Sequence, residues 1–433
     1  MKTRKINVIT LGCAKNIVDS EYLLKQLETA GFNIEHDAEN SGADTVIINT
    51  CGFINDAKEE SIDTILRYAV AKRNGEINRL IVTGCLSEKY MNDLKKEIPE
   101  VDIFFGVNSL KPLLKQMGIK ENPGLPDDRF ITGPGHYAYL KISEGCNRTC
   151  SFCTIPQIRG PHISRPAEEI LAEADLLAEK GVKELILVAQ DLNYYGVDLQ
   201  KKRMLTPLVE KLISKNRFSW IRLHYLYPAG LPESLLELIR NNKLICKYRD
   251  IPLQHITDRM LRLMRRSYTR YSAEKILWHI RETIPDVAIR TTLIAGPPGE
   301  TEKDFDELKR FVEKFRFERL GIFRYSHEDG TYSWENYADE IPEEVKEERA
   351  SEIMRIEEKI SLSLNQRAVN KIFDVIIDRS EDDFYYGRTQ YDSPEIDQEV
   401  LIPGVNNLVI GNIYKIRITG VAGHDLYGVP QKK

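Results

Sequence analysis

Three cysteines stand close together in the segment Cys146-Asn-Arg-Thr-Cys150-Ser-Phe-Cys153. The Cys-x-x-x-Cys-x-x-Cys spacing puts three thiolates on one short loop, enough to bind three irons of a 4Fe–4S cube. The fourth iron is then left open for a group that is not protein. Zinc sites, in contrast, usually combine two Cys-x-x-Cys pairs, or cysteine with histidine. The segment therefore predicts an iron–sulfur site with one iron open to an outside ligand.

Three further cysteines occupy equivalent positions at the ends of predicted strands. They end the runs Leu11-Gly-Cys13, Asn49-Thr-Cys51 and Thr83-Gly-Cys85. In an open parallel sheet, ligands gather outside the carboxyl ends of the strands, so these thiols can meet at one edge. The alternative is three buried structural cysteines, because free cysteine is often a core residue. The shared position favours a second three-thiolate iron–sulfur site.

The composition is that of an ordinary globular protein of two to four domains, with 433 residues, 42% hydrophobic and 29% charged. The net charge of −5 gives no argument for nucleic-acid binding by the whole chain. No apolar run approaches the roughly 20 residues of a membrane span, and the N-terminus lacks a signal-peptide pattern. We therefore expect a reducing cytoplasm, where cysteines are ligands or core residues; Cys246, in an apolar run, is predicted to be core.

The first part of the chain alternates β-rich runs with helical segments. We expect strands at residues 7–11, 45–49, 80–83 and 102–105, and helices at 17–30, 56–72 and 87–97. Continuous apolar strands separated by helices are typical of a parallel, doubly wound α/β sheet. We assign this domain to residues 1–120.

A second β/α series follows a Pro- and Gly-rich stretch at 121–135, which predicts a linker. Strands are expected at 137–143, 185–189, 220–226, 249–253, 289–294 and 320–325, with helices between them that include 167–180 and 272–283. Six β/α units predict a partial barrel, whose chemistry lies at the carboxyl ends of the strands. The first cysteine loop follows the first of these strands. With a charged connector helix at 341–367, this domain spans 136–366.

The last part of the chain contains short alternating runs at 373–378, 383–387, 400–402, 413–418 and 426–428. About five strands in so few residues predict a small β-barrel, appended at 367–433 as a binding module.

Together these features resemble the radical S-adenosylmethionine methylthiotransferase family along the whole chain. That family joins an N-terminal cluster domain, a central radical barrel and a C-terminal TRAM β-barrel, in the order predicted above. The resemblance implies that Cys146, Cys150 and Cys153 bind the radical 4Fe–4S cluster. Its open iron would take the amino and carboxylate groups of S-adenosylmethionine, which supplies the reactive radical.

The resemblance also implies that Cys13, Cys51 and Cys85 bind an auxiliary 4Fe–4S cluster, whose open iron carries sulfur. One S-adenosylmethionine would give its methyl group to that sulfur. A second would supply the radical that removes hydrogen from the substrate carbon, where the methylthio group then joins. A low-potential electron donor such as flavodoxin is implied as a partner, whereas the sulfur donor is left unknown.

Several weaker positions in the barrel resemble contacts to S-adenosylmethionine. Each has a structural alternative, which is loop packing for the aromatic residue and an ordinary turn for the others. These positions are Phe152, Gln190, Asp191, Asn193 and Gly296.

Three other polar residues have a functional and a structural interpretation. His255 either lines the active site or is a core histidine whose ring nitrogens are hydrogen-bonded within the protein, and the second interpretation is favoured. Arg159 and Arg165 contact a carboxylate or lie at the surface. No catalytic side chain is predicted.

Two stretches resemble the branch of the family that modifies a ribosomal protein. The first is Gly12-Cys-Ala-Lys-Asn-Ile-Val-Asp-Ser-Glu21, where tRNA-modifying branches tend to carry Gly-Cys-Gln-Met-Asn or Gly-Cys-Lys-Val-Asn. The second is Gly387-Arg-Thr-Gln-Tyr-Asp-Ser-Pro-Glu-Ile-Asp397. The implied substrate is the β-carbon of an aspartate in the twelfth protein of the small ribosomal subunit. That C–H bond is unactivated, which explains the need for a radical.

The charge of the C-terminal module agrees with a protein substrate. Residues 369–433 hold seven Lys and Arg against ten Asp and Glu, a net charge of −3. An acidic module suits a basic ribosomal protein, whereas a tRNA-binding module would be expected to show a basic patch. Two alternatives stay open: a tRNA methylthiotransferase acting on a hypermodified adenosine, and a zinc-binding, non-catalytic RNA- or ribosome-binding protein.

Overall fold

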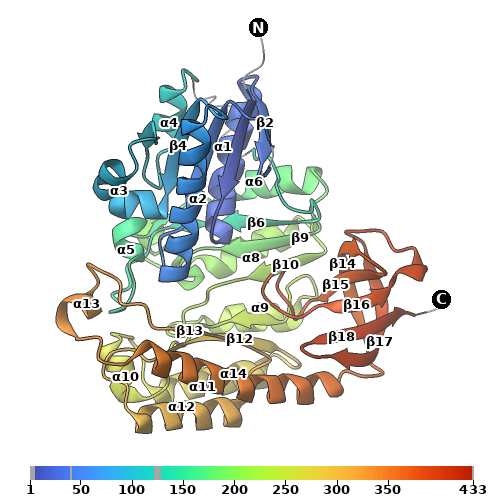
Figure 1. Cartoon of the computed structure of the whole chain (residues 1–433). Helices are drawn as coiled ribbons and strands as arrows, with labels where there is room; N and C mark the ends of the chain where they lie inside the picture. Colours follow the sequence, from blue (N-terminus) through green and yellow to red (C-terminus); the bar gives the residue numbers. More distant parts are fainter. Residues whose placement is uncertain (1–4, 40, 121–127, 432–433) are drawn as a thin grey trace.

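The computed structural model describes residues 5–39, 41–120 and 128–431. Residues 121–127 of the predicted linker and residues 1–4 of the charged N-terminus lie outside this range. Figure 1 shows three parts: an α/β sheet at the top, a half-open ring of strands and helices below it, and a small barrel at the right. No helix among the described residues is both long and apolar enough to cross a membrane.

The N-terminal part is a five-stranded parallel sheet in the order β2-β1-β3-β4-β5. Helices α1 and α4 pack on one face, and α2 and α3 on the other. The predicted doubly wound sheet is confirmed, but β2 and α4 were not predicted, since β2 is short and polar and α4 has only seven residues. The elements are β1 (Lys5–Thr10), α1 (Ala14–Thr29), β2 (Asn33–His36), β3 (Thr45–Thr50), α2 (Asn55–Arg73), β4 (Arg79–Gly84), α3 (Cys85–Glu97), β5 (Ile103–Phe104) and α4 (Leu110–Gln116).

The central part is the predicted six-unit partial barrel. Its strands form two parallel sheets, in the orders β10-β9-β6 and β11-β12-β13, and an isolated bridge between Ile221 and Ile245 continues the first sheet toward β11. The strands are β6 (Tyr137–Lys141), β9 (Glu184–Val188), β10 (Trp220–Leu223), β11 (Tyr248–Asp250), β12 (Ala288–Ala295) and β13 (Arg319–Arg324).

Helices and short elements surround these strands. Most of the outward-facing apolar side chains of the strands join the helices in one large core. The helices that cover the barrel are α6 (Ala167–Glu179), α8 (Leu205–Ser214), α9 (Glu233–Asn241), α11 (Arg270–Thr283), α12 (Glu302–Phe315) and α14 (Glu343–Gln366), and the shorter elements are β7 (Ser143–Glu144), α5 (Ile155–Ile158), β8 (Ile163–Ser164), η1 (Leu192–Tyr194), α7 (Val197–Gln200), α10 (Asp258–Leu263) and α13 (Tyr332–Asn336).

The predicted connector helix is α14. It buries Ile353 and Ile360 against the barrel and packs along α12 and β13, while much of its charged remainder faces solvent. Figure 1 shows it running beneath the barrel toward the C-terminal part. The interpretation of this helix as a connector that packs on the barrel is confirmed.

The C-terminal part is a closed five-stranded barrel, as predicted. Its strand order is β14-β15-β16-β18-β17, and alternate residues of each strand fill a small apolar core. The elements are β14 (Ile372–Glu381), β15 (Phe384–Thr389), β16 (Val400–Pro403), η2 (Gly404–Asn406), β17 (Ile413–Ala422) and β18 (Asp425–Pro430).

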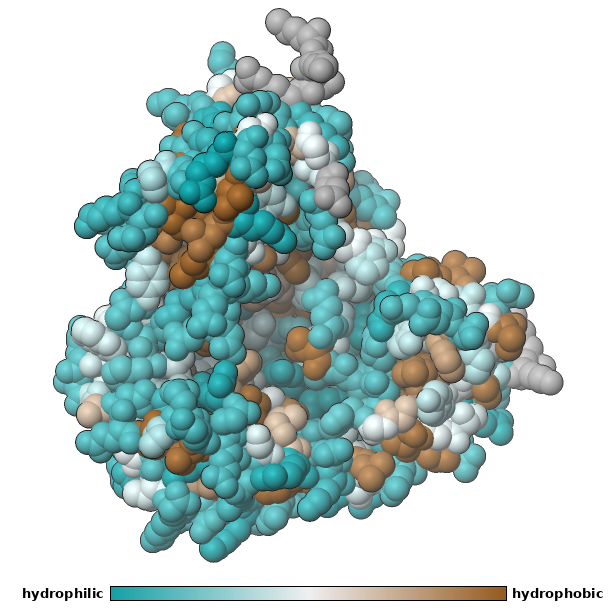
Figure 2. Space-filling view, in the orientation of Figure 1, coloured by the Kyte–Doolittle hydropathy of each residue, from teal (hydrophilic) through white to brown (hydrophobic). Residues whose placement is uncertain are grey.

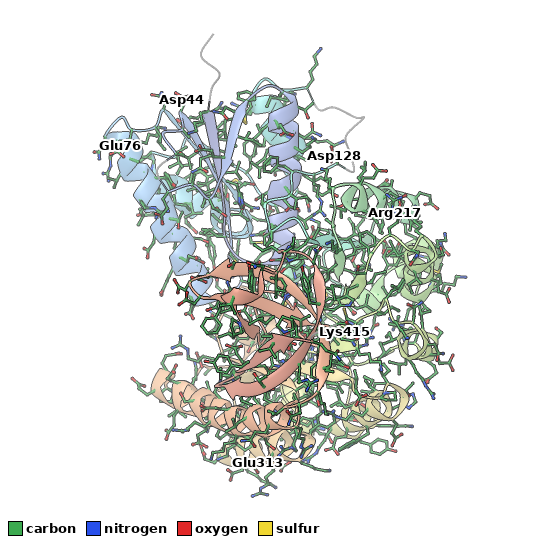
Figure 3. The ribbon with its side chains drawn as sticks, turned by 90° about the vertical axis from the view of Figure 1, so that its right-hand side faces the viewer. Asp44, Glu76, Asp128, Arg217, Glu313 and Lys415 are labelled. Atoms are coloured by element: carbon green, nitrogen blue, oxygen red, sulfur yellow. The ribbon has the colours of Figure 1, made fainter. Side chains whose placement is uncertain are left out.

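Residues 388–397, which form the end of β15 and the loop after it, pack on the inside of the radical barrel. Arg388 forms a buried ion pair with Glu184 at 2.9 Å, and Ser393 shares a 2.9 Å hydrogen bond with His224. These residues belong to the stretch 387–397, whose sequence resembles the branch of the family that modifies a ribosomal protein. Its buried members attach the small barrel to the larger one, and Figure 3 shows the small barrel seated between the N-terminal sheet and α14.

Candidate functional site

The cysteines Cys13, Cys51 and Cys85 lie at the ends of three adjacent strands. β1, β3 and β4 are neighbours in the sheet; Cys51 and Cys85 directly follow their strands, and two residues separate Cys13 from the end of β1. Cys13 is the N-cap of α1 and Cys85 is the first residue of α3. All three thiols are free. The predicted convergence at one edge of the sheet is therefore present.

Asn16 holds these strand ends together. Its side-chain amide donates hydrogen bonds to the carbonyls of Leu11 at 2.7 Å and Thr50 at 3.1 Å. Its Oδ1 lies 3.8 Å from the sulfur of Cys85. The three turns are thus fixed relative to one another before any group binds.

Positive charge surrounds this set of cysteines. Burial disfavours a thiolate at Cys13, but Lys15, Arg159 and two backbone N–H groups outweigh it and hold the pKa of the Cys13 thiol below its ordinary value. Burial raises the pKa of Cys51, and it raises that of Cys85 to about 12. Of these three thiols, only that of Cys13 has its pKa lowered in the protein alone.

The second set of cysteines lies on the 146–153 loop between β7 and α5. The backbone N–H of Cys146 donates to the carbonyl of Gly160 at 3.1 Å, and that of Cys153 donates to the carbonyl of Cys150 at 3.2 Å. Position 145 requires glycine for two reasons. Its φ of 69° is left-handed, and a Cβ there would lie 2.1 Å from the carbonyl oxygen of Pro161. The loop is therefore a defined structure at the carboxyl end of the first barrel strand, as predicted.

Arginines lie against this loop as well. Arg266 donates to the sulfur of Cys150 at 3.3 Å and stacks over the ring of Tyr227 at 4.5 Å. Burial raises the pKa of Cys146. Arg266 therefore brings a fixed positive charge to the sulfur side of the loop, a feature that no sequence pattern predicted.

The segment 190–193 lies next to this loop. Arg148 of the loop forms a forked contact with Asp191 Oδ2, at 3.0 and 2.8 Å, while Asp191 Oδ1 caps the backbone N–H of Asn193. The predicted alternative of a capped turn is therefore present. Both amide atoms of Gln190 are buried without a hydrogen-bond partner among the described residues. A bound polar ligand would satisfy such a group.

Other predicted positions have structural explanations. Phe152 packs against Met264, Ile294 and Tyr325, as its packing alternative requires. Gly296, with a φ of 71°, leaves room for the side chain of Lys346, which would lie 2.4 Å from a Cβ.

His255 and Cys246 are core residues, as predicted. His255 is fully buried, accepts the N–H groups of Ile256 and Thr257 on Nδ1, and contacts Glu300 through Nε2 at 3.1 Å. Cys246 is fully buried beside Tyr248 in the apolar base of the barrel.

Arg159 and Arg165 both contact carboxylates, and those carboxylates belong to this chain. Arg165 pairs with Glu173, and Arg159 pairs with Glu144 at 2.9 Å and Asp19 at 3.3 Å. The surface alternative is wrong for Arg159, which is only 3% exposed. Because Asp19 lies on α1 and Glu144 on β7, Arg159 joins the two cysteine-bearing parts of the molecule.

A hollow opens at the centre of the face shown in Figure 2. It lies between the N-terminal sheet, the barrel strands and the C-terminal barrel. Among the described residues, no three His, Cys, Asp or Glu side chains are arranged to hold a single metal ion. An iron–sulfur cluster does not need such an arrangement, since each iron takes its own thiolate.

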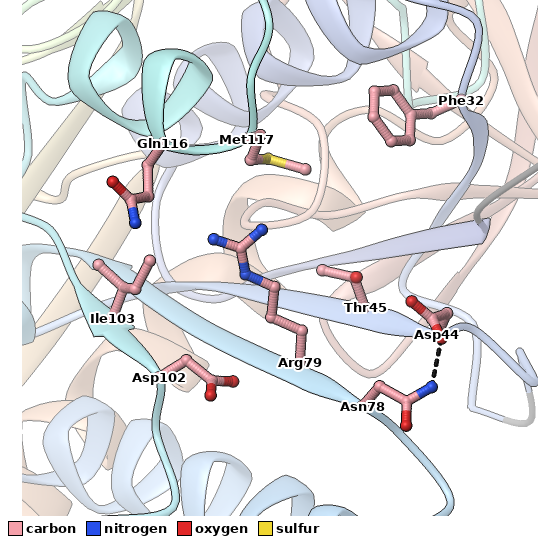
Figure 4. A pocket seen from close by; sticks show the side chains of 9 residues that line it. All are labelled: Phe32, Asp44, Thr45, Asn78, Arg79, Asp102, Ile103, Gln116 and Met117. Atoms are coloured by element: carbon pink, nitrogen blue, oxygen red, sulfur yellow. Dashed lines mark hydrogen bonds between the residues drawn. The ribbon is translucent and has the colours of Figure 1, made fainter.

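A separate polar pocket of about 500 Å³ lies at the opposite end of the N-terminal sheet. It is bordered by the first residues of β3, β4 and β5, and Figure 4 shows the Arg79 side chain reaching into it between Thr45 and Gln116. Because the cysteines stand at the other ends of these strands, this pocket is not part of their site.

Family models divide the chain into three matched regions. Residues 5–106 match the uncharacterized protein family UPF0004, residues 140–312 the radical SAM superfamily, and residues 369–430 the TRAM domain. A solved structure of the radical S-adenosylmethionine methyltransferase TsrM from Kitasatospora setae shares the fold, with a TM-score of 0.54. It is 14% identical and aligned over 74% of this chain and 72% of its own. Fold and site thus define a radical S-adenosylmethionine enzyme.

Curated relatives resemble the chain over its full length. Proteins named "Ribosomal protein uS12 methylthiotransferase RimO" from Parabacteroides distasonis and Bacteroides fragilis are 49% and 51% identical to it, over 99% of both chains in each comparison. The chain belongs to the family of these RimO proteins and is a radical S-adenosylmethionine methylthiotransferase.

Proposed function

We propose that this protein attaches a methylthio group to the β-carbon of an aspartate in ribosomal protein uS12. The observation that carries the proposal is the full-length identity of about 50% to relatives named for that reaction. The two convergent cysteine sets support it, because a radical and a sulfur carrier need separate sites.

The cofactors are two 4Fe–4S clusters and S-adenosylmethionine, and we assign the six cysteines as cluster ligands. Cys146, Cys150 and Cys153 would hold the radical cluster, and the triplet at the strand ends the auxiliary one. When bound, these groups supply the electron, the radical and the sulfur. The donor chemistry fits, because three thiolates in each set leave one iron open for a ligand that is not protein.

The residues near the 146–153 loop would bind S-adenosylmethionine. The unsatisfied amide of Gln190 is suited to its polar groups, while Asp191 holds Arg148 and caps the turn at Asn193. Phe152 and Gly296 border the same end of the barrel and are kept as weaker candidates. Since the side-chain amide of Gln190 makes no hydrogen bond to the described residues, Gln190→Ala should weaken S-adenosylmethionine binding more than it lowers stability.

We further propose three functional units, at residues 1–120, 136–366 and 367–433, and a cytoplasmic location away from membranes. A low-potential donor such as flavodoxin would supply electrons. The sulfur donor is not assigned.

Mass spectrometry of a strain that lacks the gene tests the substrate. We expect uS12 to lose the mass of one methylthio group while its tRNA is unchanged. Loss of a methylthio group from tRNA with uS12 intact would instead establish the tRNA alternative.

Cysteine variants test the division between the two sites. Anaerobically purified protein should contain about eight irons and eight sulfides per chain, and a colourless zinc protein would contradict the proposal. Cys150→Ala should abolish S-adenosylmethionine cleavage, whereas Cys13→Ala should keep cleavage, lose about four irons and block sulfur transfer. Cys246→Ala is the matched control, because Cys246 is a core residue outside both sets. Normal methylthiolation by Cys13→Ala would refute the auxiliary assignment.

A further inference from the structure

Lys15 is a buried lysine whose ammonium forms no ion pair with a carboxylate among the described residues. It lies in the first turn of α1, two residues after Cys13, and is only 8% exposed. Its ammonium stands 3.9 Å above the ring of Tyr225, and no hydrogen bond or ion pair links it to any other described residue. A buried charge without a counter-charge is costly, so such residues are normally paired.

The carboxylates nearby are already occupied by other cations. Glu144 is paired with Lys141 at 2.7 Å and with Arg159 at 2.9 Å. Asp19 contacts the same two cations. Among the described residues at the contact between the N-terminal part and the radical barrel, Lys15 is therefore the one buried cation that pairs with no carboxylate of the chain.

Tyr225, which faces Lys15, has a strained backbone. Its φ of 57° is in the left-handed region, which a tyrosine rarely adopts. Its N–H donates to Asp250 Oδ2 at 3.1 Å, which helps to hold this conformation. Tyr225 lies just beyond β10, at the barrel end where side chains reach bound molecules, and strain of this kind concentrates at functional sites.

We infer that Lys15, seated on Tyr225, binds the carboxylate of the substrate aspartyl side chain between the auxiliary cysteines and the barrel. This inference rests on the proposed function and names the residue that would recognise its substrate. A carboxylate there would complete the missing ion pair, and it would place the β-carbon one bond from the recognised group.

S-adenosylmethionine also carries a carboxylate, so the test must separate the two sources. We assign Lys15 to the protein substrate, because it projects from the N-terminal part beside Cys13 and not from the 146–153 loop. Binding is therefore measured separately for uS12 and for S-adenosylmethionine, on anaerobic protein with both clusters loaded.

The experiment compares Lys15→Met, Lys15→Arg and, as a matched control on the same helix, Lys25→Met. Lys25 pairs with Glu28 and Asp128, away from the cysteines. Each protein is titrated with uS12 and with uS12 in which the modified aspartate, located by mass spectrometry, is replaced by asparagine. Wild type and Lys25→Met should bind the aspartate form at least about tenfold more tightly. Lys15→Met should lose this preference and Lys15→Arg should retain much of it.

Each other outcome overturns the inference. An undiminished aspartate preference in Lys15→Met would show that another group reads the carboxylate, and weaker S-adenosylmethionine binding alone would assign Lys15 to the cofactor. Iron and sulfide are counted in every variant, with Lys15→Gln as a second neutral substitution. Loss of the auxiliary irons from both neutral variants would show that Lys15 serves the cluster. If wild type does not modify uS12 at all, the proposed function fails instead.

Discussion

Arg159 and Glu144 occupy the contact between the two cysteine-bearing parts of the molecule. Burial disfavours the ionised carboxylate of Glu144, but Lys141 and Arg159 outweigh it and lower its pKa to about 2. The hydrogen bond from Arg159 to Asn16, at 2.5 Å, extends this network to the residue that ties the auxiliary strand ends together. Charges at this interface thus set the position of one cysteine set relative to the other.

The low pKa of Glu144 predicts how stability depends on pH. Its contribution is complete above the unfolded pKa near 4.5 and is lost as the pH falls toward 2. In urea unfolding of the metal-free protein between pH 5 and 3, this group alone should lower the free energy of unfolding by up to about 1.4 kcal/mol per pH unit. Glu144→Gln should be less stable at pH 6 and should show a shallower loss. An equal slope in the variant would contradict this account.

At the residue scale, the sequence could predict the cysteines but not their surroundings. Strand-end spacing indicated which thiols converge, because strand direction determines where a parallel strand ends. Arg266 and Tyr225 come from segments more than 70 residues away from the cysteines that they approach, and only tertiary packing brings them there. Lys15 was visible in the Gly-Cys-Ala-Lys-Asn motif, although its lack of a partner was not.

The turns after β1 and β4 show what the N-terminal sheet requires of its strand ends. Gly84, which precedes Cys85, has a φ of 100°, and a Cβ there would lie 2.5 Å from the carbonyl of Thr50. Gly12 has a φ of 94°, and a Cβ at Gly12 would lie 2.7 Å from the Cβ of Cys51. These glycines let adjacent strand ends approach closely enough for the thiols to share one site.

Gly84→Ala therefore should damage the auxiliary site. We expect a loss of several kcal/mol in unfolding free energy and of about four irons per chain, because both the φ and the space exclude a methyl group. Gly75→Ala is the control, since Gly75 has a similar left-handed φ of 75° but no atom within 4 Å of the added carbon. It should cost only about 1 kcal/mol and keep all irons. Full iron content in Gly84→Ala would count against this role.

The segment 388–397 shows where an interpretation based on resemblance needed the structure. Its sequence indicated a branch of the family but did not predict what its residues contact. Asp392 and Ser393 are fully buried, and Asp392 pairs with Arg319 of β13. A sequence pattern shows that such residues are polar, but not which partner domain covers them.

At the scale of the whole molecule, the small barrel closes the base of the radical barrel. Trp220, Tyr248 and Ala288, which begin β10, β11 and β12, pack against Ile376 of β14. Arg388 crosses the same boundary and also pairs with Asp378 at 2.6 Å. The order of the three parts could be predicted from the sequence, whereas this packing could not, since it depends on side chains from unrelated elements.

Arg388→Met should loosen the two barrels from each other. It would remove the arginine from the buried carboxylates of Asp378, which keeps its contact with His136, and Glu184, which keeps Arg222; breaking a buried pair in this way costs about 3–5 kcal/mol. Limited proteolysis should then cut between α14 and β14 much faster than in wild type. Arg379→Met, which removes an exposed pair with Glu399 in the same module, should change stability by less than about 1 kcal/mol. Equal cutting rates for the two variants would disprove the anchoring role.

The position of the C-terminal module at the base of the radical barrel also predicts the order in which S-adenosylmethionine and the protein substrate bind and dissociate. Because the C-terminal module packs at one end of the barrel, we expect small reagents and the large protein substrate to enter and leave by the side that carries the cysteines. A bound ribosomal protein would then cover the cysteines and block the exchange of S-adenosylmethionine. Labelled S-adenosylmethionine bound beforehand should resist a chase with unlabelled compound until the protein substrate departs.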